Sequence, residues 1–424
     1  MSQHSPGAGR ARQDVIYRDG ILGRRPRVPT DLARLEAAAR RRMSRRAWAY
    51  LGYAGAGQTG RANRAAFERW EIVPRMASGV PQRDLTSNVA GTRLNSPIML
   101  APVGAADLIR RNADVQIATG AAQSGAAYIL SNQGGSPMEE TAAAMGSVPH
   151  WFQLYWSRDE QLVDSFIARA EATGAGALVV TLDTTMLGWR PADLDLGSLP
   201  FAHGYGIAQY TSDPRFGELV REHLATAPAS DVTVTPGAVR TLMEMSRRHP
   251  GSFLSNVRSP VPRAAIETFL DVYSNPALSW QHLAGLRERT RLPIVLKGIL
   301  HPDDALKARD LGVDAIMVSN HGGRQIDGAI SSLDALTDIR RALGPEFPLI
   351  LDSGIRGGAD IFKAIALGAH AVTIGRPHIY GLAVRGATGV ADVIANMEAE
   401  FELVMGLSGA SSIADISAEY LVAR

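Results

Sequence analysis

The chain has 424 residues, of which 46% are hydrophobic and 20% charged, and its formal net charge at pH 7 is +2. This composition is typical of a globular protein with a large core, and the small net charge gives no reason to expect a nucleic-acid partner. The absence of cysteine excludes disulfides, thiolate metal sites and cysteine nucleophiles. No apolar run approaches the roughly 20 residues that cross a bilayer, and no hydrophobic segment follows the basic start. We therefore expect a soluble, cytoplasmic protein without a membrane span.

Residues 1–96 precede the first predicted strand, and we expect them to form an N-terminal arm and helical extension. The pattern predicts a helix near residues 30–52, followed by a glycine-rich turn at residues 52–57. Tyr50 and Tyr53 both stand at the start of this turn, and both are candidates for a substrate-side tyrosine.

Short apolar runs alternate with helical patterns across residues 97–424. The predicted strands are 98–101, 128–130, 151–155, 178–182, 294–297, 316–319, 349–352 and 372–374. The predicted helices between them are 112–124, 138–145, 158–173, 303–311, 334–343 and 358–368. Eight strands with intervening helices predict a (β/α)8 TIM barrel. The alternative is an open doubly wound sheet, but no G-x-G-x-x-G follows the first strand.

A long interval at about residues 191–280 separates the fourth and fifth strands. It is far longer than an ordinary loop, and it carries aromatic residues and a helical stretch near residues 236–248. We expect a lid insertion over the active site with a mobile middle.

Polar residues recur at the carboxyl ends of the strands, where a barrel of this type places its chemistry. Residues 319–325, which include His321 and Arg324, follow the apolar run 315–318. A histidine can accept a proton at neutral pH, and an arginine can hold a carboxylate by two parallel hydrogen bonds. The glycines between these two residues allow the backbone to approach a flat ligand. The pattern therefore predicts an enzyme that oxidises a small carboxylic acid.

Several longer motifs resemble the FMN-dependent 2-hydroxy-acid oxidase family. The matching segments are 153–155, 181–184, 188–190, 296–298, 319–325, 352–356 and 374–377. Within that family the chain is most similar to lactate 2-monooxygenase, on residues 101–104, 188–194 and 210–214. The resemblance implies FMN as the cofactor, and it implies no metal site.

The resemblance also implies roles for the catalytic residues. His321 would be the base, although the sequence leaves open whether it takes the α-proton or the hydroxyl proton. Asp183 would hydrogen-bond the imidazole and stabilise its charged form. Arg190 and Arg324 would hold the substrate carboxylate. Tyr155 would hydrogen-bond the substrate oxygen, and Tyr50 is favoured over Tyr53 as the second tyrosine that contacts the substrate.

On the cofactor side, Lys297 would stabilise the reduced, anionic flavin. The other residues implied for FMN contact the ring face, its polar edge, the ribityl chain or the phosphate. They are Pro102, Val103, Gly104, Asn132, Gln153, Thr181, Ser319, Asp352, Gly354, Arg356, Gly375 and Arg376. Arg356 and Arg376 would bind the phosphate, because barrels of this type commonly hold a phosphate after the last two strands.

The implied activity is the oxidation of a small L-2-hydroxy acid with molecular oxygen as acceptor. Decarboxylation, as in lactate 2-monooxygenase, is favoured over simple release of 2-oxo acid and hydrogen peroxide. A methyl group missing at Gly104 would leave room for oxygen or change product retention, and a long lid would slow product escape and exclude water. A quinone-linked dehydrogenase, a non-redox phosphate-binding barrel lyase or isomerase, and a flavoprotein without turnover are the alternatives. Residues 133–135 and 184–186 differ from the lactate enzymes, so we expect a substrate larger than lactate. Relatives are often homotetramers, which predicts a homo-oligomer.

Overall fold

The computed structural model describes residues 7–226 and 234–424. Its centre is a closed barrel of eight parallel strands in the order β10-β11-β4-β5-β6-β7-β8-β9. The strands are β4 (Ile98–Leu100), β5 (Ala127–Leu130), β6 (His150–Leu154), β7 (Leu178–Thr181), β8 (Ile294–Ile299), β9 (Ala315–Val318), β10 (Leu349–Asp352) and β11 (Ala371–Ile374). The predicted TIM barrel is confirmed, and each of its strands lies where the apolar runs predicted one. Nearly every strand residue is buried, as expected for parallel strands that are covered on both faces.

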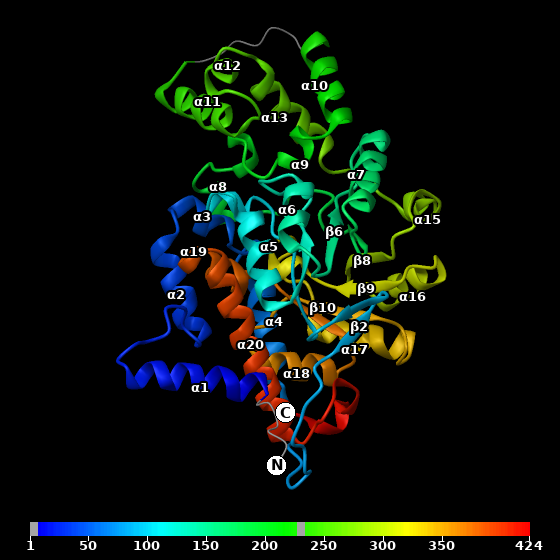
Figure 1. Cartoon of the computed structure of the whole chain (residues 1–424). Coiled ribbons are helices and arrows are strands. Elements are labelled where there is room, and N and C mark those ends of the chain that lie inside the picture. The colour runs from blue at the N-terminus through cyan, green and yellow to red at the C-terminus, as the bar shows by residue number, and fades with distance from the viewer. Residues whose placement is uncertain (1–6, 227–233) are drawn as a thin grey trace.

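Helices surround the barrel and connect its parallel strands (Figure 1). They are α5 (Ala113–Ser124), α6 (Met138–Met145), α7 (Glu160–Ala172), α16 (Pro302–Asp310), α17 (Ser332–Leu343) and α18 (Gly358–Ala366), followed after β11 by α19 (Arg376–Arg385) and α20 (Ala387–Ser408). The side chains of Asp159 and Ser331 cap α7 and α17 by accepting hydrogen bonds from backbone N–H groups. All six predicted helices are present, with ends shifted by at most two residues.

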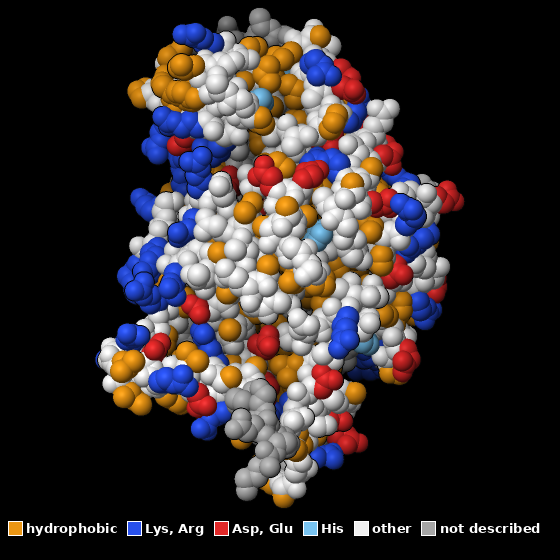
Figure 2. Space-filling model, viewed as in Figure 1, with side chains coloured by type: hydrophobic (Ala, Val, Ile, Leu, Met, Phe, Trp, Pro, Cys, Tyr) orange, Lys and Arg blue, Asp and Glu red, His pale blue; other side chains and the backbone are white. Residues whose placement is uncertain are grey.

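The N-terminal extension contains α1 (Ala8–Ile21), α2 (Leu32–Arg42), α3 (Arg45–Tyr50) and α4 (Gln58–Glu68). The single helix predicted near residues 30–52 is wrong, because Met43 is extended and Ser44 begins a new helix by accepting a hydrogen bond from the Ala47 N–H. Arg41, Arg42 and Arg45 of this extension are exposed. Figure 2 shows Lys and Arg side chains gathered along the edge of the molecule where α2 and α3 lie in Figure 1.

Two small antiparallel pairs of strands lie outside the barrel. They are β1 (Trp70–Ile72) with β12 (Leu421–Ala423), and β2 (Ser87–Val89) with β3 (Thr92–Leu94). The first pair joins the segment after α4 to the C-terminal residues, so the N-terminal extension is bound to the C-terminal end of the chain.

The insertion between β7 and β8 is largely helical, and Figure 1 shows its helices gathered at one end of the molecule, above the barrel. It contains α8 (Pro191–Leu194), η2 (Pro200–His203), α9 (Ala208–Thr211), α10 (Pro214–Thr226), α11 (Pro236–Arg248), α12 (Phe253–Val257) and α13 (Val261–Val272); α14 (Trp280–Ala284) and α15 (Leu286–Arg289) follow. A cluster of aromatic rings forms its core, with Tyr210 and Phe269 in edge contact at 4.7 Å. The prediction of a mobile middle stays a prediction, because residues 227–233 of the insertion lie outside the described residues.

In the described ranges, no helix combines the length and the apolarity that spanning a bilayer requires.

Candidate active site

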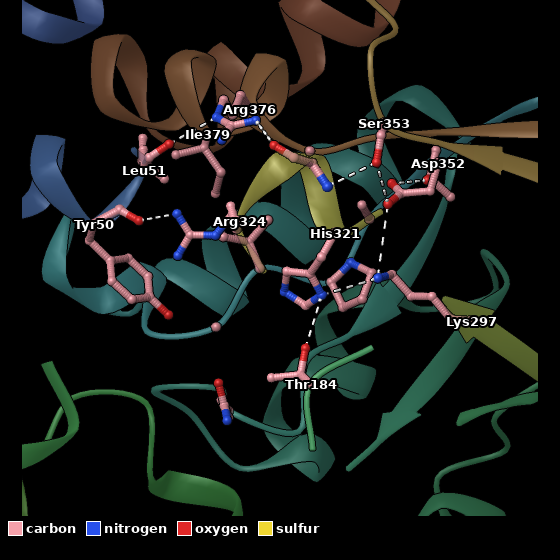
Figure 3. A pocket seen from close by; sticks show the side chains of 18 of the residues that line it. Tyr50, Leu51, Thr184, Lys297, His321, Arg324, Asp352, Ser353, Arg376 and Ile379 are labelled. Carbon is pink, nitrogen blue, oxygen red and sulfur yellow. Dashed lines mark hydrogen bonds and ion pairs between the residues drawn. The ribbon is translucent and has the colours of Figure 1, made fainter. Parts of the chain in front are cut away.

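A cavity opens at the carboxyl ends of the barrel strands, between the barrel, α3 and the insertion (Figure 3). Most of the predicted site residues line it. These are Tyr50, Pro102, Val103, Gly104, Tyr155, Arg190, Lys297, His321, Arg324, Asp352, Gly354, Arg356, Gly375 and Arg376. The remaining five, which are Asp183, Asn132, Gln153, Thr181 and Ser319, lie behind this lining.

His321 lines the cavity and forms a close pair with Asp183, which lies behind it. Asp183 follows β7, His321 follows β9, and the His321 Nδ1 lies 2.7 Å from the Asp183 Oδ1. Burial would raise the pKa of Asp183, but the adjacent His321 and Lys297 and a hydrogen bond from Thr184 hold it well below its usual range. Because Asp183 is ionised, Nδ1 carries the proton and donates it to the carboxylate. The close polar contacts of this ring within the described residues all involve Nδ1, which leaves the lone pair of Nε2 for the cavity.

Lys297, in β8, lies beside this pair. Its Nζ is 3.1 Å from the Asp183 Oδ2 and 3.4 Å from the His321 Nδ1, and its side chain is only 4% exposed. Burial and the Lys297 ammonium lower the pKa of His321, while Asp183 opposes them. The imidazole is therefore neutral at physiological pH, which is the form that can accept a proton.

The backbone around His321 adopts a conformation that a non-glycine residue rarely takes. His321 has φ 56°, and its N–H donates to the Ser319 Oγ at 2.9 Å. Ser353, which has φ 90°, accepts a hydrogen bond from the Gly322 N–H at 2.9 Å. These bonds from two neighbouring strand ends stabilise the strained loop and fix the direction of the imidazole.

Arg190 and Arg324 lie on one side of this histidine. Arg190 donates to the Arg324 carbonyl at 3.1 Å and to the Gln325 Oε1 at 2.8 Å. Arg324 donates to the carbonyls of Tyr50 and Gly52. Neither guanidinium forms an ion pair with a carboxylate in the described residues, and burial, followed by repulsion from Arg190, lowers the pKa of Arg324 to about 9. Asp193 lies near both guanidiniums but forms an ion pair with neither, so the two adjacent cations remain a site for a carboxylate ligand.

The structure places the two candidate tyrosines of the N-terminal turn differently. Tyr50 is 6% exposed, lines the cavity, and lies with its ring 4.9 Å from the Arg324 guanidinium carbon. Tyr53 does not line the cavity, and its ring packs 4.2 Å from the guanidinium carbon of Arg376. Tyr155 faces the cavity from the end of β6, and burial raises the pKa of its hydroxyl, which therefore stays protonated and able to donate a hydrogen bond.

Polar side chains from three neighbouring strands form a hydrogen-bonded row below the cavity. The Ser131 Oγ is 3.3 Å from the Gln153 Oε1, and the Gln153 Nε2 is 3.0 Å from the Thr181 Oγ1. Asn132, which the sequence placed in this row, instead points away, and its Oδ1 accepts from the Tyr155 N–H and the Tyr210 hydroxyl. Ser131 is therefore the residue that sequence reasoning missed. The strand alternation from Leu130 could have identified it, because successive side chains point to opposite faces.

Arg356 and Arg376, at the ends of β10 and β11, occupy the far end of the cavity. Arg376 donates to the carbonyls of Leu51 and Gly322, and Arg356 donates to the Ile355 carbonyl. Neither has a carboxylate partner in the part of the chain that the structure describes, and burial and the proximity of Arg376 lower the pKa of Arg356. The nearby helices α18 and α19 begin at glycines that provide no side-chain cap. The backbone at Gly354 and at Gly375, where α19 begins, lines the cavity beside the two guanidiniums, and together they form a donor set that fits a phosphate.

Asp352 does not add a free negative charge to this phosphate region. Its Oδ1 accepts from Thr373 at 2.5 Å, and its Oδ2 accepts from Ser319 at 2.6 Å and from Ser353 at 3.2 Å. Asp352 and Ser319 therefore connect strands β9, β10 and β11 below the cavity.

The sequence predicted an open space for oxygen next to Gly104, where a methyl group is missing. A Cβ at this position would lie 2.9 Å from both the Cβ and the Oε1 of Gln133 and 3.5 Å from the Tyr50 hydroxyl. The side chain of Gln133 therefore occupies the space that the missing methyl leaves, and the expectation of a gap is wrong.

The barrel and this site are those of an enzyme whose cavity offers cationic donors suited to a phosphate at one end and to a carboxylate at the other. The family of FMN-dependent dehydrogenases matches residues 39–423. A similar protein is the FMN-dependent alpha-hydroxy acid dehydrogenase qulF of Penicillium citrinum, 39% identical over 405 residues, which are 95% of this chain and 93% of that protein. Another is an L-lactate oxidase of Lysinibacillus sphaericus, 40% identical over 91% of this chain and 90% of that protein.

Solved structures agree with these sequence comparisons. A mandelate oxidase with (S)-4-hydroxymandelic acid has a TM-score of 0.76 at 30% identity, covering 93% of this chain and 99% of that one. The chain belongs to the FMN-dependent dehydrogenase family, its cofactor is FMN, and its reaction is the oxidation of a 2-hydroxy acid. The predicted family and cofactor are confirmed, and the non-redox barrel alternative is wrong.

Proposed function

We propose that this protein oxidises a small L-2-hydroxy acid larger than lactate to the 2-oxo acid, with molecular oxygen as the acceptor. The observation that carries this proposal is the position of His321, whose Nδ1 is held by Asp183 while its ring lines the same cavity as Arg190 and Arg324. One cavity thus brings together a proton acceptor and a receptor for a carboxylate.

The residues act in a defined order in this proposal. Arg190 and Arg324 bind the substrate carboxylate and fix the α-carbon, and the Tyr155 hydroxyl hydrogen-bonds the substrate oxygen. His321 accepts the proton that leaves the substrate on Nε2, and Asp183 stabilises the resulting imidazolium. FMN, when bound, accepts the two electrons that the 2-hydroxy acid loses.

The residues for FMN follow from the donor groups described above. Arg356 and Arg376 would hold the phosphate with the backbone of Gly354 and Gly375. Lys297, Gln153 and Thr181 would bond the polar edge of the ring, with Ser131 in the place first given to Asn132. Pro102, Val103 and Gly104 would lie against the ring face, and Ser319 and Asp352 would support this region from below.

For the second half-reaction we propose decarboxylation of the 2-oxo acid by hydrogen peroxide before release, as in lactate 2-monooxygenase. The support is the resemblance in the sequence and the insertion, whose Phe201 and Tyr273 line the cavity and would slow the escape of product. The products would be a carboxylic acid one carbon shorter, carbon dioxide and water. The alternatives are release of 2-oxo acid and peroxide, and transfer of electrons to a quinone.

Product analysis in air, with and without catalase, separates these outcomes. The proposal expects oxygen consumption with carbon dioxide and the shorter acid as products, and no effect of catalase. Stoichiometric hydrogen peroxide and free 2-oxo acid would show a simple oxidase, and absence of oxygen consumption with an active quinone assay would show a dehydrogenase.

We also propose that the protein is a homo-oligomer, by resemblance a tetramer. Apolar side chains near the cavity mouth support this assembly, since Met186 is 66%, Trp189 73% and Ile326 68% exposed. Light scattering on the purified protein tests it, and a monomer at micromolar concentration would contradict it.

A further inference from the structure

One wall of the cavity is not used by the proposed chemistry. The reacting groups, the two arginines for the substrate and the flavin contacts account for the floor and the far end. The remaining wall faces the insertion and includes Gln133, Leu187, Phe201 and Tyr273. This wall is where the side chain of a bound 2-hydroxy acid would lie.

Gln133 has a fixed backbone and a free amide. Its N–H donates to the Ser131 Oγ at 3.1 Å, and its carbonyl accepts from the Ala105 N–H at 2.8 Å. Its side-chain amide has no hydrogen bond to any described residue, although Gln133 is only 6% exposed and lines the cavity. An enclosed amide without a partner is costly unless a ligand or water supplies one.

The direction of this amide is known from Gly104. The Gln133 Oε1 lies 2.9 Å, and the Tyr50 hydroxyl 3.5 Å, from the point where a Cβ at Gly104 would be. The amide is therefore close to the tyrosine that lies beside Arg324, on the substrate side of the cavity.

The other groups of this wall leave the amide as a distinct polar position. Phe201 and Tyr273 contribute aromatic surface, with ring centroids 6.1 Å apart. The hydroxyl of Thr184 is already engaged with Asp183 at 2.9 Å and with the His321 Nδ1 at 3.1 Å. No carboxylate or ammonium group of the described residues faces Gln133 from this wall, so its partner is expected to be neutral.

We propose that Gln133 is a specificity-determining residue that selects 2-hydroxy acids with a neutral hydrogen-bonding group on the side chain, a hydroxyl being the simplest case. This inference rests on the proposed 2-hydroxy-acid oxidation. A site with a buried polar group discriminates against an analogue that leaves the group unpaired, whereas an apolar pocket discriminates weakly against an added hydroxyl.

The test uses pairs of substrates that differ only by a terminal hydroxyl in place of a methyl. The pairs are (S)-glycerate with (S)-2-hydroxybutyrate, and (S)-2,4-dihydroxybutyrate with (S)-2-hydroxyvalerate. We expect kcat/KM to favour the hydroxylated member of at least one pair by about 10-fold or more. Gln133→Met keeps the length of the side chain but removes its hydrogen-bonding groups. In this variant the ratio of kcat/KM between the two members of the pair should fall to about one, because kcat/KM of the hydroxylated acid decreases.

Ligand binding without turnover provides a second readout. The oxidised holoenzyme is titrated with hydroxypyruvate and with 2-oxobutyrate, and Kd is obtained from the flavin absorbance. The wild type should bind hydroxypyruvate more tightly than 2-oxobutyrate, and Gln133→Met should remove this difference in Kd. Tyr273→Phe, the matched control for the other hydroxyl in this wall, should leave it unchanged.

Two results would overturn this proposal: a wild-type preference for the methyl member of both pairs, or an equal effect of Gln133→Met on both members. If the acids are oxidised but neither hydroxylated member is preferred over its methyl counterpart, only the role of Gln133 fails. If no 2-hydroxy acid of any pair reduces the flavin, the proposed function itself fails.

Discussion

The two sides of the cavity differ in how fully their polar groups are bonded. On the barrel side, Asp183 accepts from His321, Lys297 and Thr184, and Asp352 accepts from three hydroxyls. Where the cavity faces the insertion, the Gln133 amide forms no hydrogen bond to a described residue. One oxygen each of Asp107, which follows β4, and Asp114, in α5, is also buried without a hydrogen bond. The bonded side holds the reacting groups in a single geometry, while the other side leaves polar groups for a ligand or for titration. The chemistry therefore depends on the barrel, and we expect specificity and pH-dependent stability to depend on the insertion side.

The largest loss of activity is expected for His321→Ala on the bonded side. Removal of the proton acceptor should lower the rate of flavin reduction by about 10⁴-fold, at the upper end of general-base effects. Rapid mixing with substrate under anaerobic conditions measures this rate, and the flavin content of the variant serves as the control. A loss below 10-fold with full flavin content would show that another group takes the proton.

Asp183→Asn should reduce kcat by about 10²–10³-fold, since the imidazolium loses its charged partner. Asp183 raises the pKa of His321 against burial and Lys297, so its removal lowers that pKa further. In the wild type, kcat/KM should fall as pH drops through a His321 pKa below 6.5, and in the variant this acid limb should move to still lower pH. A pH profile with its acid limb unmoved in Asp183→Asn would contradict the pairing.

Arg190→Lys should lower kcat/KM by about 10–100-fold, because an ammonium cannot reproduce the planar donors that bind the Arg324 carbonyl and the substrate carboxylate. The loss should appear mainly as an increase in KM. The exposed Arg45→Lys is the matched control and should leave both constants unchanged.

Asp114→Asn should stabilise the protein, and more so at high pH. Burial raises the pKa of Asp114 to about 6, although hydrogen bonds from the backbone N–H groups of Gly135 and Ser136 lower it in part. The titratable groups near Asp114 are Asp107 and Tyr128. The unfolded carboxyl ionises near pH 3.8, so the folded state binds more protons between pH 4 and 6, and stability falls as pH rises through that window. Asp114→Asn should therefore increase the free energy of unfolding at pH 8 by about 1–2 kcal/mol more than it does at pH 5. Melting temperatures at both pH values measure it, and equal gains would contradict the raised pKa.

The barrel and most of its site could be predicted because each strand is a short apolar run that ends in a polar residue. His321, Asp183 and Arg324 are separated by up to about 140 positions, but the closed order of the strands brings their ends together at one mouth. Residues at strand ends are therefore placed by the fold alone, without knowledge of side-chain rotamers.

The errors of the sequence analysis arise where local geometry decides. Ser131 and Asn132 are neighbours at the end of β5, and their side chains point in opposite directions. An error of one residue in the sequence prediction therefore replaces Ser131, which is in the hydrogen-bonded row with Gln153, by Asn132, which contacts Tyr210. The break of the first helix depends on the cap formed by Ser44. The occupation of the space beside Gly104 by Gln133 depends on a contact between two loops that no periodicity reports.

The most direct test of the account is anaerobic mixing of the FMN holoenzyme with matched L- and D-2-hydroxy acids. The account predicts that the flavin absorbance bleaches with an L-2-hydroxy acid in the wild type and remains oxidised on the same timescale in His321→Ala. An unchanged flavin spectrum with every acid of the panel, or equally fast bleaching in the variant, would contradict the assignment of this cavity as a 2-hydroxy-acid oxidation site with His321 as its base.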